Sequence, residues 1–197
     1  MYKNFFKRFL DLTLSLFASF VLLPVFVVIA TAIKIDSKGP VLFFQKRIGL
    51  KKATFDICKF RTMRANAPKD TPTHLLSDPK SYITKTGHFL RQTSLDELPQ
   101  LYNIVVGDMS IVGPRPALWN QSDLVKERDK YKANDIRPGL TGWAQINGRD
   151  DLSIPEKAVL DGEYVKNLSL KTDIMCIVKT IMVVICRSGI SEGKNIE

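Results

Sequence analysis

The sequence contains few of the residues that build metal or redox centres. Its 197 residues include three cysteines and two histidines. The cysteines fall in apolar surroundings without the spacing of metal ligands, and the histidines are isolated from one another. These residues are Cys58, Cys176, Cys186, His74 and His88. We therefore expect no zinc site, and we expect the thiols to be reduced structural groups in a cytosolic compartment.

Glycine-rich phosphate-binding loops are also missing. The chain has neither the pattern of a P-loop nor that of a dinucleotide-binding turn, and it shows no internal repeat. The phosphates of a ligand would therefore have to be held by cationic side chains and a metal ion.

Acidic residues are outnumbered by basic ones. Lys and Arg total 29 against 20 Asp and Glu, which gives a formal net charge of +9. This balance favours an anionic partner, and nucleic acid, acidic lipid headgroups and a phosphorylated small molecule all remain open. The length and the 45% hydrophobic content suit one domain with a proper core and are too small for two sizeable ones.

Only one long apolar run is present, from Phe9 to Ile33, and it is interrupted by Asp11 and small hydroxyl residues. About 20 apolar residues suffice to span a bilayer, so a transmembrane helix is the simplest interpretation. A cleaved signal peptide is disfavoured because the run is long and lacks a small-x-small cleavage site.

Two features favour a re-entrant hairpin over residues 1–36 instead. Pro24 lies in the middle of the run, where it removes a backbone hydrogen bond and kinks a helix. Both flanks are basic, which keeps both ends on the cytosolic side. The flanking residues are Lys3, Lys7 and Arg8 before the run, and Lys34, Lys38, Lys46, Arg47, Lys51 and Lys52 after it. A spanning helix remains the alternative.

The stretch from Arg91 to Arg115 carries the strongest chemical signal, because it places the adjacent carboxylates of Asp96 and Glu97 between two arginines. Ser94 and Glu97 form a capping-box pattern, which predicts a helix that begins at Ser94, runs to about residue 107 and has a first turn distorted by Pro99. The acids could simply complement the helix dipole. Alternatively, they hold a divalent cation and leave one carboxylate free to attack phosphorus.

Rigid backbone surrounds a third arginine in Gly113-Pro-Arg-Pro116. Flanked by Pro114 and Pro116, the guanidinium of Arg115 is pre-organised to meet an anion or to stack on a base.

The remaining elements are predicted from periodicity, turn residues and caps. A β-hairpin is expected over 41–47 and 53–60, a flexible cover over 65–81, a short helix over 83–90 that delivers Arg91, and a surface helix over 117–132 whose charges need no function. A shaped, irregular loop is expected over 137–149, with Trp143 in packing or interfacial anchoring. Two further helices are expected over 154–167, capped by Ser153, and over 171–187, followed by a frayed tail from residue 188.

Four blocks of the sequence occur together in one order: Lys59-Phe-Arg-Thr-Met63, Thr93-Ser-Leu-Asp-Glu-Leu-Pro-Gln-Leu101, Gly107-Asp-Met-Ser-Ile-Val-Gly-Pro-Arg-Pro116 and Arg137-Pro-Gly-Leu-Thr-Gly-Trp143. In these blocks the chain resembles the monotopic phosphoglycosyl transferases, which include bacterial enzymes that start glycan assembly on polyprenol phosphate. Where that family commonly has a Ser-Pro pair at the break of its re-entrant helix, this chain has Leu23-Pro24.

The resemblance implies an α+β, membrane-associated helical domain with a small β-hairpin. Residues 1–36 would form the re-entrant membrane anchor, and residues 37–197 a catalytic domain on the cytosolic face of the bacterial inner membrane. The implied partners are a UDP-sugar, polyprenol phosphate and inner-leaflet lipids, with no nucleic acid and a possible homo-oligomer. Members that act on hexoses and on N-acetylated sugars share these blocks.

The resemblance also implies a reaction, in which a phosphosugar passes from the UDP-sugar to polyprenol (undecaprenyl) phosphate and UMP is released. We hypothesise that Asp96 attacks the β-phosphorus to form a covalent intermediate, with Mg²⁺ held by Asp96 and Glu97. Lys59 and Arg91 would neutralise substrate charge. The segment Pro114, Arg115 and Pro116 would lie at the nucleotide end, and Arg137 and Arg149 would be anion contacts.

Two other classes of protein are weighed against this hypothesis. A non-catalytic basic module that binds anionic membrane lipids explains the charge and the apolar run, but it assigns no role to Asp96 and Glu97. Polytopic sugar-phosphate transferases need several membrane spans, and the single apolar run disfavours them.

Overall fold

The computed structural model describes residues 2–68, 79–148 and 151–186. The elements in chain order are the π-helical turn η1 (Tyr2–Phe6), α1 (Lys7–Val21), α2 (Leu23–Asp36), β1 (Leu42–Ile48), the 3₁₀ turn η2 (Leu50–Lys52), β2 (Thr54–Phe60), α3 (Pro79–Tyr82), α4 (Lys85–Gln92), the 3₁₀ turn η4 (Leu95–Glu97), α5 (Gln100–Val106), β3 (Ser110–Val112), α6 (Ser122–Asp129), the 3₁₀ turn η5 (Ala133–Asp135), β4 (Gly139–Thr141), α7 (Trp143–Ile146), α8 (Ile154–Lys166) and α9 (Leu170–Cys186). The mixture of helices with small sheets agrees with the predicted α+β class.

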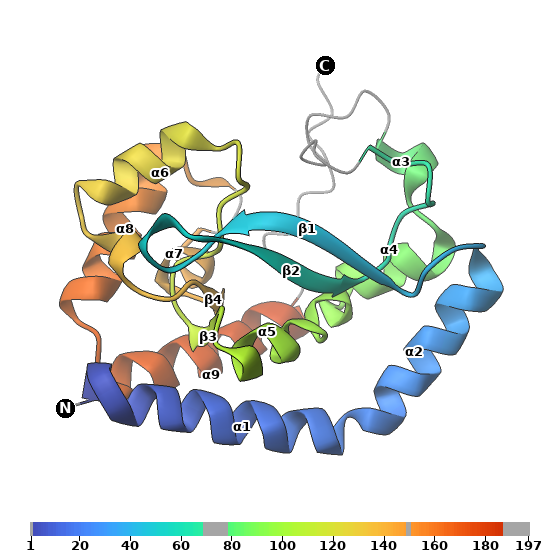
Figure 1. Cartoon of the computed structure of the whole chain (residues 1–197), viewed down its shortest axis with the longest axis horizontal. Helices are drawn as coiled ribbons and strands as arrows, with labels where there is room; N and C mark the ends of the chain where they lie inside the picture. Colours follow the sequence, from blue (N-terminus) through green and yellow to red (C-terminus); the bar gives the residue numbers. More distant parts are fainter. Residues whose placement is uncertain (1, 69–78, 149–150, 187–197) are drawn as a thin grey trace.

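The apolar run forms two helices, α1 and α2, that meet at Leu22 with a bend of 61° (Figure 1). Pro24 lies in the first turn of α2, where a missing backbone N–H costs no helical hydrogen bond. Within the described residues, no single helix combines the length and apolar composition needed to cross a bilayer, whereas this bent pair does so when taken together. The predicted break is therefore present at Leu22–Pro24.

The fully buried residues of α1 are all polar, although Ala18 near its end packs against the hydrophobic core. Lys7, Asp11 and Ser15 are spaced four residues apart and are all buried. The Asp11 carboxylate accepts hydrogen bonds from the Ser110 hydroxyl (2.7 Å) and from the backbone N–H of Ile111 (3.1 Å). The opposite face exposes large apolar side chains, among them Phe9, Leu14, Leu16, Phe17 and Phe20. Asp11, which interrupts the apolar run in the sequence, thus fastens α1 to β3.

The other end of the bent pair is fastened to α4. Ile29 and Ile33 of α2 are buried in a cluster with Phe60 and Leu90. At the end of α2, the Asp36 carboxylate accepts a hydrogen bond from the backbone N–H of Thr86 (2.7 Å). The helix that carries Arg91 is therefore docked on α2.

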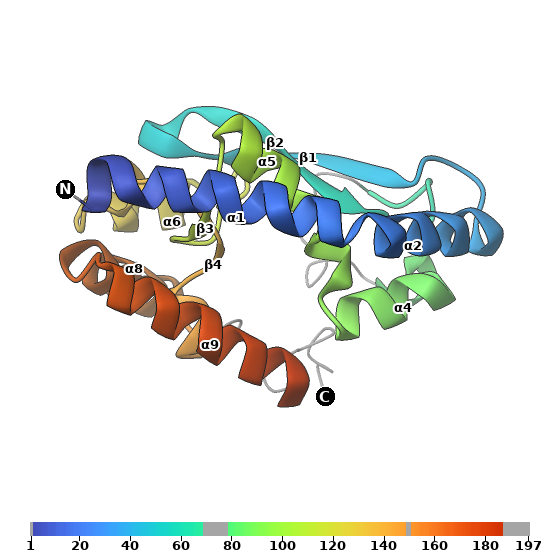
Figure 2. The same ribbon diagram turned by 90° about the horizontal axis from the view of Figure 1, so that it is seen from below.

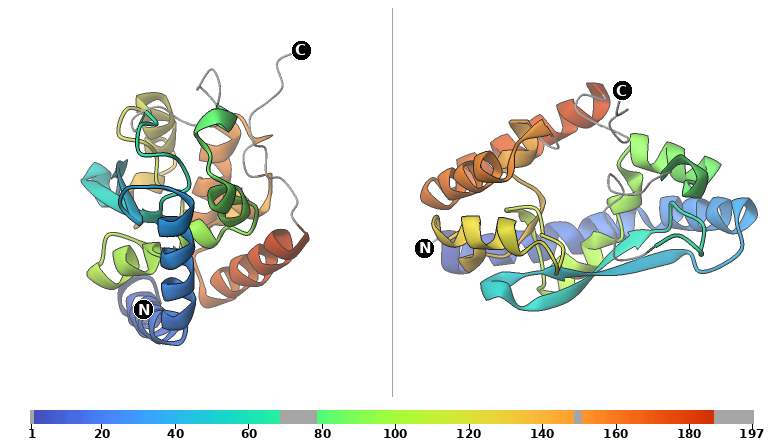
Figure 3. Two further views of the ribbon diagram at one scale, coloured as in Figure 1. Left: turned by 90° about the vertical axis from the view of Figure 1, so that its right-hand side faces the viewer. Right: turned by 90° about the horizontal axis from the view of Figure 1, so that it is seen from above.

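The predicted β-hairpin is present as an antiparallel ladder of β1 and β2, paired from Leu42 with Phe60 to Ile48 with Thr54. The turn between the strands is the short helical turn η2. The hairpin runs across the molecule, with α6 and α8 near its turn and α3 and α4 near its other end (Figure 1 and Figure 3).

A second, two-stranded sheet pairs β3 and β4 in parallel. It corrects the expectation that 137–149 is an irregular loop, because this segment contains both β4 and α7. Gly139 and Gly142 in this segment allow its backbone to pack closely against the backbone of Gly113. A Cβ atom on Gly139 would lie 2.1 Å from the backbone nitrogen of Gly113, and one on Gly142 would lie 2.1 Å from the Gly113 carbonyl oxygen.

The predicted helix over 117–132 is shorter than expected, since α6 covers only Ser122–Asp129. Its charges are not all solvated, which also corrects the prediction: Arg128 is buried and pairs with Asp161 of α8 (2.6 Å). The helix over 154–167 is confirmed as α8, and Ser153 and Glu156 form the capping box at its start. The expected cover over 65–81 and the tail from residue 188 lie largely or wholly outside the described residues.

Candidate active site

The two adjacent carboxylates lie in a short turn and not in a capped α-helix. Ser94 has φ 55° and makes no side-chain capping hydrogen bond, so the predicted capping box is wrong. Asp96 and Glu97 belong to the 3₁₀ turn η4, and α5 begins only after Pro99. Proline fixes the backbone at the start of α5, and the tighter turn before it presents both carboxylates outside the regular helix.

Glu97 is held between two cations. Its Oε1 accepts hydrogen bonds from Lys59 Nζ (2.8 Å) and from Arg115 Nη2 (2.7 Å). Burial alone would raise the pKa of this carboxyl, but Arg115 and Lys59 together outweigh burial and hold the pKa well below its usual range. Glu97 is therefore ionised at any working pH, and it orders the two cations around it.

Asp96 has the opposite environment, although it is the next residue. Burial raises its pKa, and the charge of Glu97 adds to the rise, while Lys59, Arg91 and Arg115 offset part of it. Within the described part of the chain, no hydrogen bond or ion pair occupies the Asp96 carboxylate. A partly desolvated carboxylate with no direct partner, and with three cations nearby, is suited to nucleophilic attack on a phosphate.

Arg91 reaches the site from the end of α4. Its Nε donates a hydrogen bond to the Thr62 hydroxyl (2.9 Å), which follows β2. Gly87 allows α4 to approach this segment, because a Cβ atom there would lie 2.0 Å from the Thr62 carbonyl oxygen. The end of β2 thus supplies both Lys59 and the support for Arg91.

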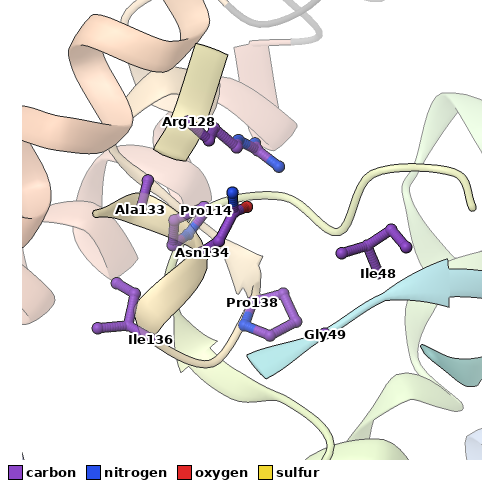
Figure 4. A pocket seen from close by; sticks show the side chains of 8 residues that line it. All are labelled: Ile48, Gly49, Pro114, Arg128, Ala133, Asn134, Ile136 and Pro138. Atoms are coloured by element: carbon purple, nitrogen blue, oxygen red, sulfur yellow. The ribbon is translucent and has the colours of Figure 1, made fainter. Parts of the chain in front are cut away.

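The loop that carries Arg115 is clamped on its backbone by two further arginines. Arg128 Nη1 donates to the Arg115 carbonyl (2.9 Å), and Arg47 Nη1 donates to the Pro116 carbonyl (3.1 Å). Pro114 and Pro116 are buried. Behind the loop lies a cavity of about 10 Å³ with Pro114 and Arg128 on its wall, which has room for one water and not for a substrate (Figure 4).

Arg47, Arg128 and Asp161 were not among the residues predicted for the site. The sequence signal that could have indicated them is weak: an arginine on a predicted strand, and a basic and an acidic residue on two separate helices. The pairing of Arg128 with Asp161, and the hydrogen bond from Arg47 to the Pro116 carbonyl, form only when the chain folds.

The comparison with known families agrees with this geometry. A family model described as "Bacterial sugar transferase" matches residues 2–187. The chain belongs to the bacterial sugar transferase family.

Relatives of this sugar transferase include both short and long chains. It is 40% identical over 194 residues to the "Uncharacterized sugar transferase EpsL" of Bacillus subtilis (strain 168), covering 96% of this chain and 92% of that protein. It is 41% identical over 187 residues to the "Undecaprenyl-phosphate glucose phosphotransferase" of Komagataeibacter xylinus, covering 89% of this chain and 35% of the relative. It is 39% identical over 183 residues to the "UDP-glucose:undecaprenyl-phosphate glucose-1-phosphate transferase" of Escherichia coli (strain K12). This match covers 89% of this chain and 39% of the relative.

The predicted family and enzyme class, a phosphoglycosyl transferase, are thereby confirmed. A non-catalytic lipid-binding module is not favoured. The sugar transferase spans most of the Bacillus relative, but only about a third or somewhat more of the other two.

The structure gathers Lys59, Arg91, Asp96, Glu97 and Arg115, as expected for one site in a sugar transferase. Arg137 is engaged elsewhere, since its Nε donates to the Gly107 carbonyl (2.8 Å). Arg149 lies outside the described residues. Substrate contacts for these two arginines therefore stay predictions.

An all-protein metal cage is not found among the described residues, which contain no group of three or more His, Cys, Asp or Glu able to hold an ion. Asp96 and Glu97 nevertheless fit the way proteins bind Mg²⁺ with phosphorylated substrates. In such sites one or two carboxylates share the ion with the substrate phosphates and water.

Proposed function

We propose that this sugar transferase moves a sugar phosphate from a UDP-sugar to undecaprenyl phosphate, releases UMP, and does so through a covalent intermediate on Asp96. The names of the Komagataeibacter and Escherichia relatives support the overall reaction. The observation that carries the covalent step is the contrast within η4. Glu97 forms ion pairs with Lys59 and Arg115, whereas the desolvated Asp96 carboxylate has no direct partner among the residues that the structure describes.

In the first step, an oxygen of the Asp96 carboxylate attacks the β-phosphorus of the UDP-sugar. The bond from that phosphorus to the oxygen bridging the two phosphates breaks, and UMP leaves with the bridging oxygen. Lys59, Arg91 and Arg115 surround the carboxylates, so they are placed to neutralise the diphosphate as its charge is redistributed. Arg115 is about half exposed, which leaves its guanidinium accessible to an incoming phosphate.

In the second step, a phosphate oxygen of the acceptor lipid attacks the same phosphorus. The bond to the Asp96 oxygen breaks, the carboxylate is regenerated, and the product is a lipid diphosphate that carries the sugar. Dividing the transfer in two allows the water-soluble donor product to depart before the lipid reacts.

Mg²⁺ is proposed as the cofactor, held by Asp96 and Glu97 together with the diphosphate. When bound, it would neutralise charge on the transferred phosphate and polarise its oxygens. Glu97 would have to share its oxygens between the ion and its two cationic partners, which the fourfold lone-pair capacity of a carboxylate permits.

Membrane association is proposed through the bent pair of α1 and α2, as a re-entrant anchor on the cytosolic side of the inner membrane with residues 37–197 as the catalytic domain. The outward faces of these helices expose apolar side chains, including Phe17, Phe20, Val27, Val28 and Ile35. Hydrogen bonds of Asp11 in α1 and of Asp36 at the end of α2 join the two helices to the catalytic domain. The pathway would be the first membrane step of bacterial glycan assembly, such as exopolysaccharide.

The test uses a panel of UDP-sugars and radiolabelled UMP, without lipid. The first step predicts Mg²⁺-dependent exchange of label into the UDP-sugar and a sugar-phosphate adduct on the protein. Asp96→Asn, which keeps the shape and removes a partly buried charge, should fold normally and lose both signals. The matched variant Asp108→Asn, outside η4, should keep both. An adduct that still forms on Asp96→Asn would exclude Asp96 as the nucleophile.

A further inference from the structure

An apolar groove of about 290 Å³ leads away from the two carboxylates. Its lining comes from residues 93–98, which include Glu97, and from β3, β4, α7 and α9. Its apolar lining includes Leu95, Leu98, Leu140, Ile146, Ile177 and Ile181. The mechanism described above uses none of these side chains.

The three threonine hydroxyls along the groove are already hydrogen-bonded within the protein. Thr93 Oγ1 donates to the Phe89 carbonyl, and Thr180 Oγ1 donates to the Cys176 carbonyl and is also bonded to Thr141 Oγ1. Gln145 Nε2 donates to the Leu140 carbonyl. Among the described residues, one buried lining acceptor has no donor, Gln145 Oε1. A sugar or a uridine needs several donors and acceptors at once, so this lining does not suit either.

The groove is also next to a surface suited to lipid. Along α9, the residues that flank the lining are exposed and apolar: Ile174, Val178 and Met182. Figure 2 shows α1, α2 and α9 on the same face of the molecule, and α1 is joined to α9 by the ion pair of Lys7 with Asp173 (2.7 Å). An apolar chain lying in the groove could therefore continue into the lipid layer that the outward faces of these helices would contact.

We propose that this groove binds the prenyl chain of the acceptor, namely the isoprene units nearest its phosphate, an inference that rests on the proposed function. The phosphate would lie at the Glu97 end, among Lys59, Arg91 and Arg115. The groove volume lies just below the range of about 300–1,000 Å³ usual for ligand pockets, so the groove accommodates only the first part of a long chain. The groove thus sets the acceptor class, a lipid phosphate, and orients its phosphate toward Asp96.

The test fills the groove with Ile181→Trp and compares it with Met182→Trp. Both positions are on α9 and similarly exposed, 54% and 58%, but only Ile181 lines the groove. Kinetics are measured in detergent micelles, so that membrane binding does not contribute. Ile181→Trp should raise the KM for undecaprenyl phosphate about tenfold, a loss of about 1.4 kcal/mol in binding. Its UMP exchange without lipid should stay near that of the wild type, and Met182→Trp should change neither quantity more than about twofold.

A second measurement does not depend on turnover. A prenyl phosphate with a photoreactive group on its second isoprene unit should label peptides that contain Leu98 or Ile177, and Ile181→Trp should suppress this labelling. Equal KM values for the two tryptophan variants, or labelling confined to α1 and α2, would overturn the groove assignment. A rise in the KM for the UDP-sugar instead would assign the groove to the donor. Absence of UMP exchange in the wild type, with labelling intact, would refute the proposed reaction and leave the groove assignment standing.

Discussion

Neighbouring residues in one short turn acquire opposite acidities from what lies against each. Lys59 and Arg115 contact Glu97 directly and hold its pKa low, whereas burial and the charge of Glu97 raise the pKa of Asp96. The general rule is that a direct cationic partner favours the charged form and desolvation disfavours it. One carboxylate is thereby fixed as a permanent anion, and the other is made more basic and more nucleophilic.

This contrast predicts the pH dependence of the first step. Asp96 attacks only when ionised, and its raised pKa means that it becomes protonated at a higher pH than an ordinary aspartate, whose pKa is about 3.9. The rate of UMP exchange should therefore fall as the pH decreases, with the slope expected for one protonation. The midpoint of this fall should lie above the pKa of an ordinary aspartate. Glu97 should not contribute, because its pKa lies below its usual range. Exchange rates at saturating UDP-sugar provide the measurement, and a plateau that extends down to the pH of an ordinary aspartate would contradict the prediction.

At the level of elements, α1 reverses the usual arrangement of an amphipathic helix. Its charged residues Lys7 and Asp11 are buried, and most of its large apolar side chains are exposed. Asp11 accepts two hydrogen bonds from β3, and Lys7 pairs with Asp173 of α9, which in turn accepts from Tyr164 Oη (2.6 Å). Buried charges are tolerated only when paired and hydrogen-bonded in this way. The helix therefore joins the proposed anchor to the catalytic domain through specific polar contacts.

Asp11→Leu tests this arrangement, because it makes α1 more apolar and yet should destabilise the protein. The Ile111 N–H would lose its acceptor, and an unsatisfied buried group costs about 1–3 kcal/mol. The Ser110 hydroxyl would lose its link to α1 and keep only the Val112 carbonyl as its acceptor. Thr13→Leu, on the exposed face of the same helix, is the matched control. Thermal unfolding in detergent should give a lower Tm for Asp11→Leu alone, and equal Tm values for the two variants would show that the polar contacts do not hold α1.

The pair of α6 and α8 supports the Arg115 loop from behind. Arg128 donates through Nε to Asp161 (2.8 Å) and through Nη1 to the Arg115 carbonyl (2.9 Å), and both side chains are almost fully buried. Removing one member of a buried ion pair costs about 3–5 kcal/mol, whereas replacing both with apolar residues is often close to neutral.

Arg128→Leu should therefore destabilise the protein strongly, and the double variant Arg128→Leu with Asp161→Leu should regain much of the lost stability. The double variant should not regain the affinity for the UDP-sugar, because the Arg115 carbonyl still lacks its donor and the loop is held less firmly. We expect its KM for the UDP-sugar to be raised about tenfold. Tm and the KM in UMP exchange are the two measurements. Full recovery of both by the double variant would show that Arg128 has no positioning role.

On the scale of the whole molecule, the helices α1, α2 and α9 lie on one side (Figure 2), and each exposes large apolar side chains. The described helices reach hydrocarbon-spanning length only as the bent pair of α1 and α2. If the pair is re-entrant, both of its ends lie on the cytosolic side. Single cysteines replacing Lys3 and Lys38 should then both resist a membrane-impermeant maleimide added outside intact cells, and both should react after the membrane is opened. Labelling of either position from outside would favour a spanning helix, and the unsubstituted protein measures the background from its own thiols.

Much of the site could be predicted from the sequence because its residues lie in short continuous blocks. Asp96 with Glu97, Lys59 near the end of a strand, and Arg115 between two prolines are local patterns, and the structure brings them together. The helix start at Ser94 was wrong because the capping-box pattern ignores the constraint that Pro99 places on the following turn. The loop expected over 137–149 was wrong because its glycines permit close contact with Gly113, a residue distant in the sequence.

By itself the sequence determined the family, the hairpin, the bend near Pro24 and the carboxylate pair, since each depends on residues close together in the chain. The tertiary structure alone decided that Glu97 is ion-paired directly with Lys59 and Arg115, that Asp11 holds α1 to the catalytic domain, and that Arg128 with Asp161 supports Arg115. The reason is that acidity, burial and pairing are properties of the surroundings of a side chain, and those surroundings are formed by segments far apart in the chain, 166 residues in the case of Lys7 and Asp173.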